Sequence, residues 1–133
     1  MEKVYTTPLL DKLGIRPGMR VAIVGVPDIW FRELVTDRTS DVTLGLPLPD
    51  TDVVLLAADS VAELADLAGL RARIRPNGAI WVVSRKGRAA TLRYADLLGV
   101  ATAVGLVDNK VVSFSDTHTA LRFVIPIALR PRG

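Results

Sequence analysis

Two continuously apolar runs constrain the fold of this 133-residue chain more than any other feature of its sequence. Residues 51–58 (TDVVLLAA) and 79–84 (AIWVVS) are apolar at nearly every position, as in strands that are buried on both faces. Residues 59–74 (DSVAELADLAGLRARI) lie between the two runs and carry apolar side chains at helical spacing. Residues 76–78 (PNG) then predict a turn into the second run. Strand, helix and strand in this order predict a parallel sheet with helices packed against it.

The segments before these runs extend the same pattern. A short helix is expected at residues 9–13, ended by Gly14, and a strand is expected at residues 20–24. A second helix begins near Asp28, whose carboxylate is expected to accept hydrogen bonds from N–H groups of the first turn. Residues 41–46 (DVTLGL) predict a weak edge strand, because a glycine and nearby prolines do not suit the centre of a sheet.

The segments after the runs predict a helix and a hairpin. The helix begins near Ala89 and ends at either Gly99 or Gly105, and the sequence does not decide between these two glycines. Two strands follow at residues 106–114 and 120–127. Because only five residues (SDTHT) join them, an antiparallel hairpin is expected.

Together these elements predict one α/β domain over residues 1–133, with a three-layer, Rossmann-like, mainly parallel sheet and a C-terminal antiparallel hairpin. Residues 41–46 should form the outer strand, followed by residues 20–24, the two apolar runs and the hairpin. Only residues 120–127 should run antiparallel to the rest. Ligands of such sheets bind beyond the carboxyl ends of the strands, where the strand order reverses.

Composition bears on partners and location. The 17 basic and 14 acidic side chains give a net charge of only +3 without a basic cluster, which argues against nucleic acid as a partner. The absence of cysteine and the single histidine exclude thiolate and multi-histidine metal sites. With no signal-peptide pattern and no apolar run near the ~20 residues that span a bilayer, a cytoplasmic protein without membrane contact is expected. The half-hydrophobic composition is compatible with a homodimer and equally with a sheet covered on both faces.

The loop after the first predicted strand resembles a nucleotide cradle but has few glycines. Gly25 is followed by Val26, Pro27 and Asp28, where a dinucleotide loop would carry further glycines. Positive φ is costly for a β-branched residue, and proline lacks an N–H donor. The carboxylate of Asp28 would also lie at the positive end of the following helix, which disfavours a pyrophosphate. We therefore expect no cofactor.

Polar residues follow several predicted strands at the point where each strand ends. The carboxyl ends of parallel strands share one edge of the sheet, so these side chains could ring one crevice and orient a small polar ligand. His118 could act there as a general base, since its unperturbed pKa is ~6.5. Ordinary polar loop groups would produce the same pattern, and the catalytic residues stay unknown. The candidate crevice comprises Gly25, Asp28, Asp59, Ser60, Ser84, Lys86, Asp116 and His118.

Three segments together resemble class I S-adenosylmethionine-dependent methyltransferases. They are residues 14–25 (GIRPGMRVAIVG), 52–64 (DVVLLAADSVAEL) and 74–83 (IRPNGAIWVV). The resemblance implies the fold predicted above and S-adenosylmethionine as a ligand. The chain is shorter than such enzymes and leaves no room for an extra helix–strand–helix near residues 46–51. It also lacks the acidic residue that would hold the ribose at the end of the second strand.

A closer resemblance is to domain-of-unknown-function family thirty-fifty-two, a family of small bacterial proteins. It is carried by residues 12–21 (KLGIRPGMRV), 78–86 (GAIWVVSRK), 105–110 (GLVDNK) and 118–123 (HTALRF). The family has tryptophan-proline where this chain has Ser84 and Arg85, and tryptophan where this chain has His118. The resemblance implies a divergent bacterial member of the family and no particular activity.

These observations favour a small, non-catalytic binding or interaction module with a truncated methyltransferase-like fold. The first alternative is an enzyme or sensor that binds S-adenosylmethionine or another nucleoside, and the glycine-poor loop argues against it. The second alternative is an anion or nucleic-acid binder that uses Arg85, Lys86 and Arg88, and the modest net charge argues against it. In the favoured interpretation, S-adenosylmethionine is disfavoured as a cofactor.

Overall fold

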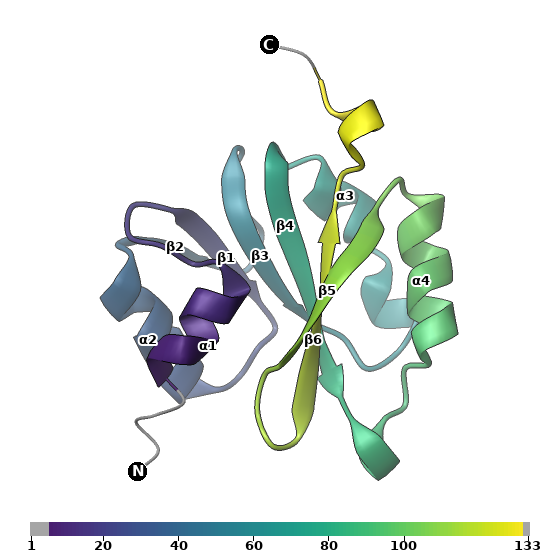
Figure 1. Cartoon of the computed structure of the whole chain (residues 1–133), viewed down its shortest axis with the longest axis horizontal. Helices are drawn as coiled ribbons and strands as arrows, with labels where there is room; N and C mark the ends of the chain where they lie inside the picture. Colours follow the sequence, from purple (N-terminus) through teal and green to yellow (C-terminus); the bar gives the residue numbers. More distant parts are fainter. Residues whose placement is uncertain (1–5, 132–133) are drawn as a thin grey trace.

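The two apolar runs form the centre of a six-stranded sheet in the computed structural model, which describes residues 6–131 (Figure 1). The strand order is β2-β1-β3-β4-β6-β5. Strand β6 pairs antiparallel with both of its neighbours, and the other pairings are parallel. The predicted fold class and strand order are therefore confirmed. The strands are β1 (Arg20–Val24), β2 (Asp41–Leu44), β3 (Thr51–Ala57), β4 (Ile74–Arg85), β5 (Val107–Ser113) and β6 (His118–Val124).

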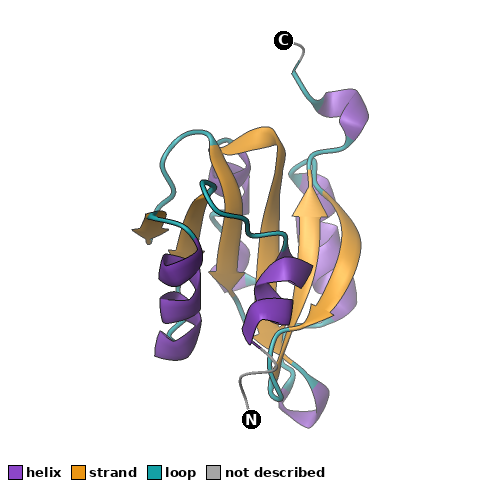
Figure 2. Cartoon of the chain, turned by 60° about the vertical axis from the view of Figure 1, so that its left-hand side comes forward, coloured by secondary structure: helices purple, strands orange, loops and turns teal. Residues whose placement is uncertain are grey.

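Helices cover both faces of the sheet (Figure 2). Helices α1 (Thr6–Leu13) and α2 (Ile29–Arg38) pack on one face, where Phe31 and Val35 are fully buried. Helices α3 (Leu67–Arg71) and α4 (Tyr94–Ala103) pack on the other. Three short 3₁₀ turns complete the described elements: η2 (Ala62–Leu64), η3 (Gly87–Ala89) and η4 (Ile127–Leu129).

The central strands bury both of their faces because their side chains alternate between the two helical layers. In β4, Ile80 and Val82 face the layer of α3 and α4, whereas Trp81 and Val83 face the layer of α1 and α2. Trp81 is fully buried, and its indole N–H donates to the carbonyl oxygen of Leu13 at 3.1 Å. This hydrogen bond joins the end of α1 to the centre of the sheet.

The predicted helix over residues 59–74 is wrong in its length and continuity. The chain forms the 3₁₀ turn η2 and then the five-residue helix α3. The buried side chains are Leu64, Leu67 and Leu70, each three residues apart. A three-residue spacing suits a 3₁₀ turn as well as an α-helix, so burial of these leucines does not require one continuous α-helix. A capping contact begins the segment, because the Glu63 N–H donates to Ser60 Oγ at 3.3 Å.

Residues 76–78 belong to β4 and do not form the expected turn before it. The register with β3 shifts there, because Thr51 pairs with Ile74 but Val53 pairs with Ala79. A Cβ atom on Gly78 would lie only 3.0–3.1 Å from three backbone carbonyl oxygens, those of Thr51 and Asp52 in β3 and of Arg75 in β4. Glycine therefore permits the close approach at this bulge.

The last helix and the hairpin differ slightly from expectation. Helix α4 begins at Tyr94, later than predicted, and buries Leu97 and Ala101. Of the two candidate ends, Gly105 matches the structure: it has a φ of +83°, and the N–H of Leu106 donates back to the Ala101 carbonyl. His118 opens β6, so it belongs to the hairpin strand and not to the connection.

Candidate functional site

The sequence-predicted candidates lie at the end of the sheet where β1, β3 and β4 finish, in the lower part of Figure 1. Because β6 is antiparallel, its first residue, His118, reaches the same end and pairs with Arg85. The strand order changes direction between β1 and β3, since the chain passes from β1 outward to β2 and then back to β3. The end of β1 is therefore a topological switch point, where α/β sheets bind ligands.

Gly25 leaves β1 at this switch point. Its φ is +77°, a conformation that favours glycine, and its position is exposed. A Cβ atom there would lie 3.8 Å from the Cβ atom of Ala57, so Gly25 lies against the end of β3. Val26 turns inward and is buried beneath the loop. Only one of the residues after β1 therefore needs the left-handed conformation.

Asp28 precedes α2, as predicted, but the predicted hydrogen bond is wrong. Its carboxylate makes no bond to the backbone of the first helical turn. Instead, Asp28 Oδ2 accepts from the indole N–H of Trp30 at 3.1 Å. The first-turn N–H groups of α2 are thus not capped by this carboxylate, and the argument that Asp28 fills the positive end of the helix is weakened.

Asp59 is engaged with the loop after β4. Its Oδ1 accepts from the backbone N–H of Arg85 at 2.8 Å, and its Oδ2 lies 3.8 Å from Arg85 Nε. Its carbonyl oxygen accepts from the Thr91 hydroxyl at 2.6 Å. The backbone N–H of Asp59 donates to Glu63 at 2.7 Å, next to the Ser60 contact described above. These bonds give Asp59 and Ser60 a role in holding the β3 and β4 loops together.

The remaining candidates belong to β4 and the hairpin. Ser84 is buried within β4, where little of its side chain reaches solvent. Lys86 Nζ donates to Ser113 Oγ at 2.9 Å, and His118 Nδ1 lies 2.8 Å from the hydroxyl of Thr117. Asp116 is exposed in the connection between the strands. All eight candidates thus lie at one end of the sheet, while their grouping around a single crevice stays a prediction.

Three aromatic side chains that were not singled out from the sequence lie at this end. Phe114, which follows β5, packs on Trp30 and Phe31 of α2 with ring centroids 5.5 and 4.8 Å apart. Trp30 remains 42% exposed, whereas Phe31 and Phe114 are buried. The cluster joins the start of α2 to the hairpin. Its only sequence signal is the adjacent pair in "IWF", which does not reveal a partner more than 80 residues away along the chain.

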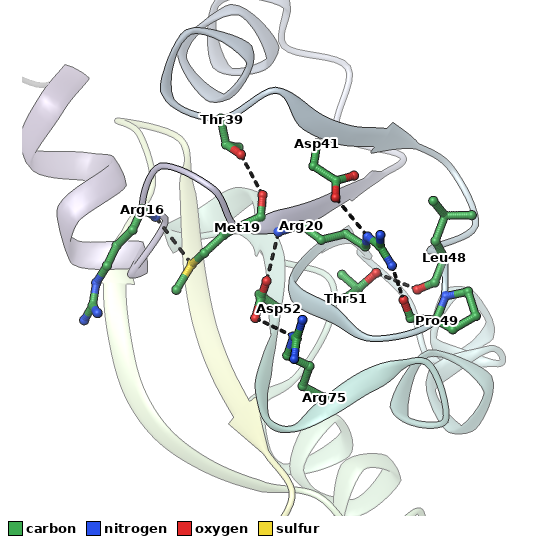
Figure 3. Close-up of polar contacts among 10 residues, drawn as sticks. All are labelled: Arg16, Met19, Arg20, Thr39, Asp41, Leu48, Pro49, Thr51, Asp52 and Arg75. Atoms are coloured by element: carbon green, nitrogen blue, oxygen red, sulfur yellow. Dashed lines mark hydrogen bonds and ion pairs between the residues drawn. The ribbon is translucent and has the colours of Figure 1, made fainter.

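Paired charges occupy the opposite end of the sheet, where β1 and β3 begin (Figure 3). Asp52 accepts from the backbone N–H of Arg20 at 2.9 Å and from Arg75 Nε at 3.0 Å. Arg20 Nε also donates to Asp41 at 3.0 Å. These bonds connect the beginnings of β1, β2, β3 and β4, and they account for the charges of Asp41 and Asp52.

The structure shows neither a metal cluster nor a membrane-spanning helix within residues 6–131. No group of three or more histidine, cysteine, aspartate or glutamate side chains in this range could hold a metal ion. No helix in the same range is both long enough and apolar enough to cross a bilayer.

The fold and the switch point define a methyltransferase-like Rossmann domain. The chain is similar to the pyocyanin biosynthetic protein PhzM, with 13% identity, 92% of this chain covered and a TM-score of 0.69. It is also similar to the N-methyltransferase NodS from Bradyrhizobium japonicum, with 12% identity, 94% of this chain covered and a TM-score of 0.66. A third similar structure is the O-methyltransferase NcsB1 from neocarzinostatin biosynthesis, with 14% identity, 91% of this chain covered and a TM-score of 0.66.

These matches cover different shares of the known proteins. The chain spans about half of PhzM (54%) and of NcsB1 (53%), but it covers 96% of the NodS chain. No protein-family model matches the sequence, and no curated protein matches it. The methyltransferase-like fold is therefore established by structure, whereas the resemblance to family thirty-fifty-two rests on the quoted segments alone.

The comparisons correct the expectation that the chain takes no cofactor. NcsB1 was solved in complex with S-adenosylmethionine, and another structure with this fold is a SAM-dependent methyltransferase from Aquifex aeolicus. A structure with this fold therefore holds S-adenosylmethionine, contrary to the expectation that the fold here takes no cofactor. The physical reason for the error lies in the loop after β1, where further glycines were thought necessary: only Gly25 has a positive φ there, and Val26 is buried without needing one.

Proposed function

We propose that this chain binds S-adenosylmethionine at the end of β1, as a methyltransferase-like enzyme or sensor. The observation that carries the proposal is the position of Gly25, which lies at the switch point in the left-handed conformation. A glycine in that place lets the backbone approach a ligand closely. The similarity of the fold to methyltransferases, one of them solved with S-adenosylmethionine, supports the choice of ligand.

The surroundings of Gly25 suit the charges of S-adenosylmethionine. Its carboxylate would be attracted to the uncapped first turn of the ten-residue helix α2, where the helix dipole is positive. Its sulfonium and ammonium groups are cationic, so the carboxylate of Asp28 and the half-exposed ring of Trp30 offer favourable partners. A pyrophosphate has neither cation and would find no N–H donor at Pro27. The chemistry thus favours S-adenosylmethionine over a dinucleotide.

His118 is the candidate acid–base group for a methyl acceptor. It lies at the same end of the sheet as Gly25, and an imidazole ring can both accept and donate a proton. Lys86 follows the end of β4 and donates a hydrogen bond to Ser113 Oγ in the hairpin. The resemblance to family thirty-fifty-two supports the proposal that this chain is a divergent bacterial member of that family. This family suggests no particular methyl acceptor.

Calorimetric titration with S-adenosylmethionine tests the proposal. We expect one saturable site with a dissociation constant of about 100 µM or tighter, equivalent to roughly −5.5 kcal/mol or better. The dinucleotide NAD, which contains adenosine but also a pyrophosphate, serves as the control and should bind at least about tenfold more weakly. Absence of saturable heat with about 1 mM S-adenosylmethionine, or tighter binding of NAD, would contradict the proposal.

A further inference from the structure

We propose that a pocket at the opposite end of the sheet binds a small organic anion through a carboxylate or phosphate group that contacts Arg122. The pocket has a volume of about 240 Å³. It lies where α1 joins β1 and where β3 and β4 begin, whereas Gly25 lies where β1 ends. The residues that line it include Gly14, Arg16, Asp52, Asn77 and Arg122.

Arg122 brings a positive charge to this pocket, and no carboxylate within residues 6–131 forms an ion pair with it. Its Nη1 atom donates to the amide oxygen of Asn109 at 3.3 Å. Burial and the nearby charge of Arg130 lower the pKa of Arg122, so its protonated form is destabilised in this environment. A bound anion would relieve both effects, because an opposite charge stabilises the protonated guanidinium.

Neighbouring cations strengthen this positive charge. Arg16 also lines the pocket. Lys110 pairs with Arg122 across the hairpin, and its Nζ atom donates to the carbonyl oxygen of Lys12 at the end of α1. Arg16 and Arg122 thus bring positive charge to the pocket from two separate segments, and Lys110 lies next to Arg122 in the neighbouring strand. Such an arrangement concentrates anions from solution.

The one carboxylate that lines the pocket is already neutralised. Asp52 accepts a hydrogen bond from the Arg20 backbone N–H and forms an ion pair with Arg75 Nε at 3.0 Å (Figure 3). Its charge therefore opposes an incoming anion only weakly. Asn77, an exposed residue of the β4 bulge, adds an amide that can donate to or accept from a ligand hydroxyl group.

The size and donor set limit the ligand class. A pocket of about 240 Å³ is smaller than the ~300–1,000 Å³ typical of drug-sized ligands, so a small metabolite suits it and a nucleotide does not. A guanidinium can donate two parallel hydrogen bonds to a carboxylate or a phosphate. The site is independent of the S-adenosylmethionine site, because the two lie at opposite ends of the strands.

Titrations with malonate and with inorganic phosphate, at constant ionic strength and followed by amide NMR, test this site and distinguish the two anion chemistries. We expect at least one probe to bind saturably, with a dissociation constant on the order of 1 mM, and to shift the signals of Gly14 and of the Asn77 side chain. Arg122→Gln should weaken that binding at least about tenfold, since it removes the charged donors. Arg88 lies in the exposed 3₁₀ turn η3, beyond the far end of β4, so Arg88→Gln should bind the anion with the same affinity as the unchanged protein.

Other results would overturn the proposal. Failure of both probes to saturate, unchanged binding by Arg122→Gln, or shifts confined to residues near Gly25 would each show that no anion site exists here. If Arg122→Gln does not fold, Arg16→Gln replaces it and should weaken binding several-fold, and unchanged binding would again refute the site. Saturating S-adenosylmethionine should leave the anion affinity unchanged, so the two proposals can fail separately.

Discussion

Replacing Trp81 by alanine should lower the free energy of unfolding by about 3–5 kcal/mol, as large aromatic truncations in cores do. The side chain is fully buried between α1 and the sheet, so its removal leaves a cavity that the neighbours fill only in part. The carbonyl of Leu13 also loses its indole donor, which adds roughly 1 kcal/mol. Because a domain of this size is stable by about 5–15 kcal/mol, the variant should be near the limit of folding.

Urea denaturation measures this loss, and two further variants separate its causes. Trp81→Phe keeps most of the apolar volume but loses the N–H donor, so it should cost about 1–2 kcal/mol. Trp30→Ala removes a ring that is 42% exposed and should cost less than Trp81→Ala. Equal losses for Trp81→Ala and Trp30→Ala would show that the sheet and α1 do not pack around Trp81 as described.

Replacing Gly25 by valine should weaken S-adenosylmethionine binding at least tenfold, which corresponds to roughly 1.4 kcal/mol or more. Valine at a φ of +77° is strained, and its side chain would stand where the backbone is expected to approach the ligand. The strain alone should lower stability by about 1–3 kcal/mol. Calorimetry with S-adenosylmethionine and urea denaturation of the same variant separate the two effects.

Gly18→Val is the matched control for this prediction. Gly18 has a similar φ of +85° and no neighbouring atom within 4 Å of an added Cβ, but it lies in the turn before β1. Valine at Gly18 should therefore lower stability to a similar degree and leave the affinity for S-adenosylmethionine unchanged. If both variants lose affinity equally, the effect of Gly25→Val arises from strain and not from contact with the ligand.

The sheet could be predicted from the sequence because its central strands carry a strong local signal. The run from Thr51 to Ala57 is apolar on both faces, which indicates a buried parallel strand without knowledge of its partners. The helix after it could not be predicted in detail, because Leu64, Leu67 and Leu70 suit a 3₁₀ repeat as well as an α-helix. In that segment, packing against the sheet decides whether the chain forms 3₁₀ turns, with 3.0 residues per turn, or an α-helix, with 3.6.

The site was predicted less completely because its features depend on contacts between distant segments. Strand order alone brings Gly25, Asp59 and His118 to one end of the sheet, and this followed from the predicted topology. The orientation of Asp28 toward Trp30 depends on a side-chain rotamer that no spacing rule specifies. The pocket beside Arg122 combines residues from α1, β3, β4 and β6, so no local sequence pattern could reveal it.

The central claim is that S-adenosylmethionine binds where β1 ends, and amide NMR during titration with this ligand tests it most directly. We predict saturable shifts at Gly25, at the indole N–H of Trp30 and at Asp59, which lie at the switch point or beside it. Signals of Gly14 and Asn77, at the other end of the sheet, should stay in place. No saturable shift up to about 2 mM ligand, or shifts confined to Gly14 and Asn77, would contradict the account.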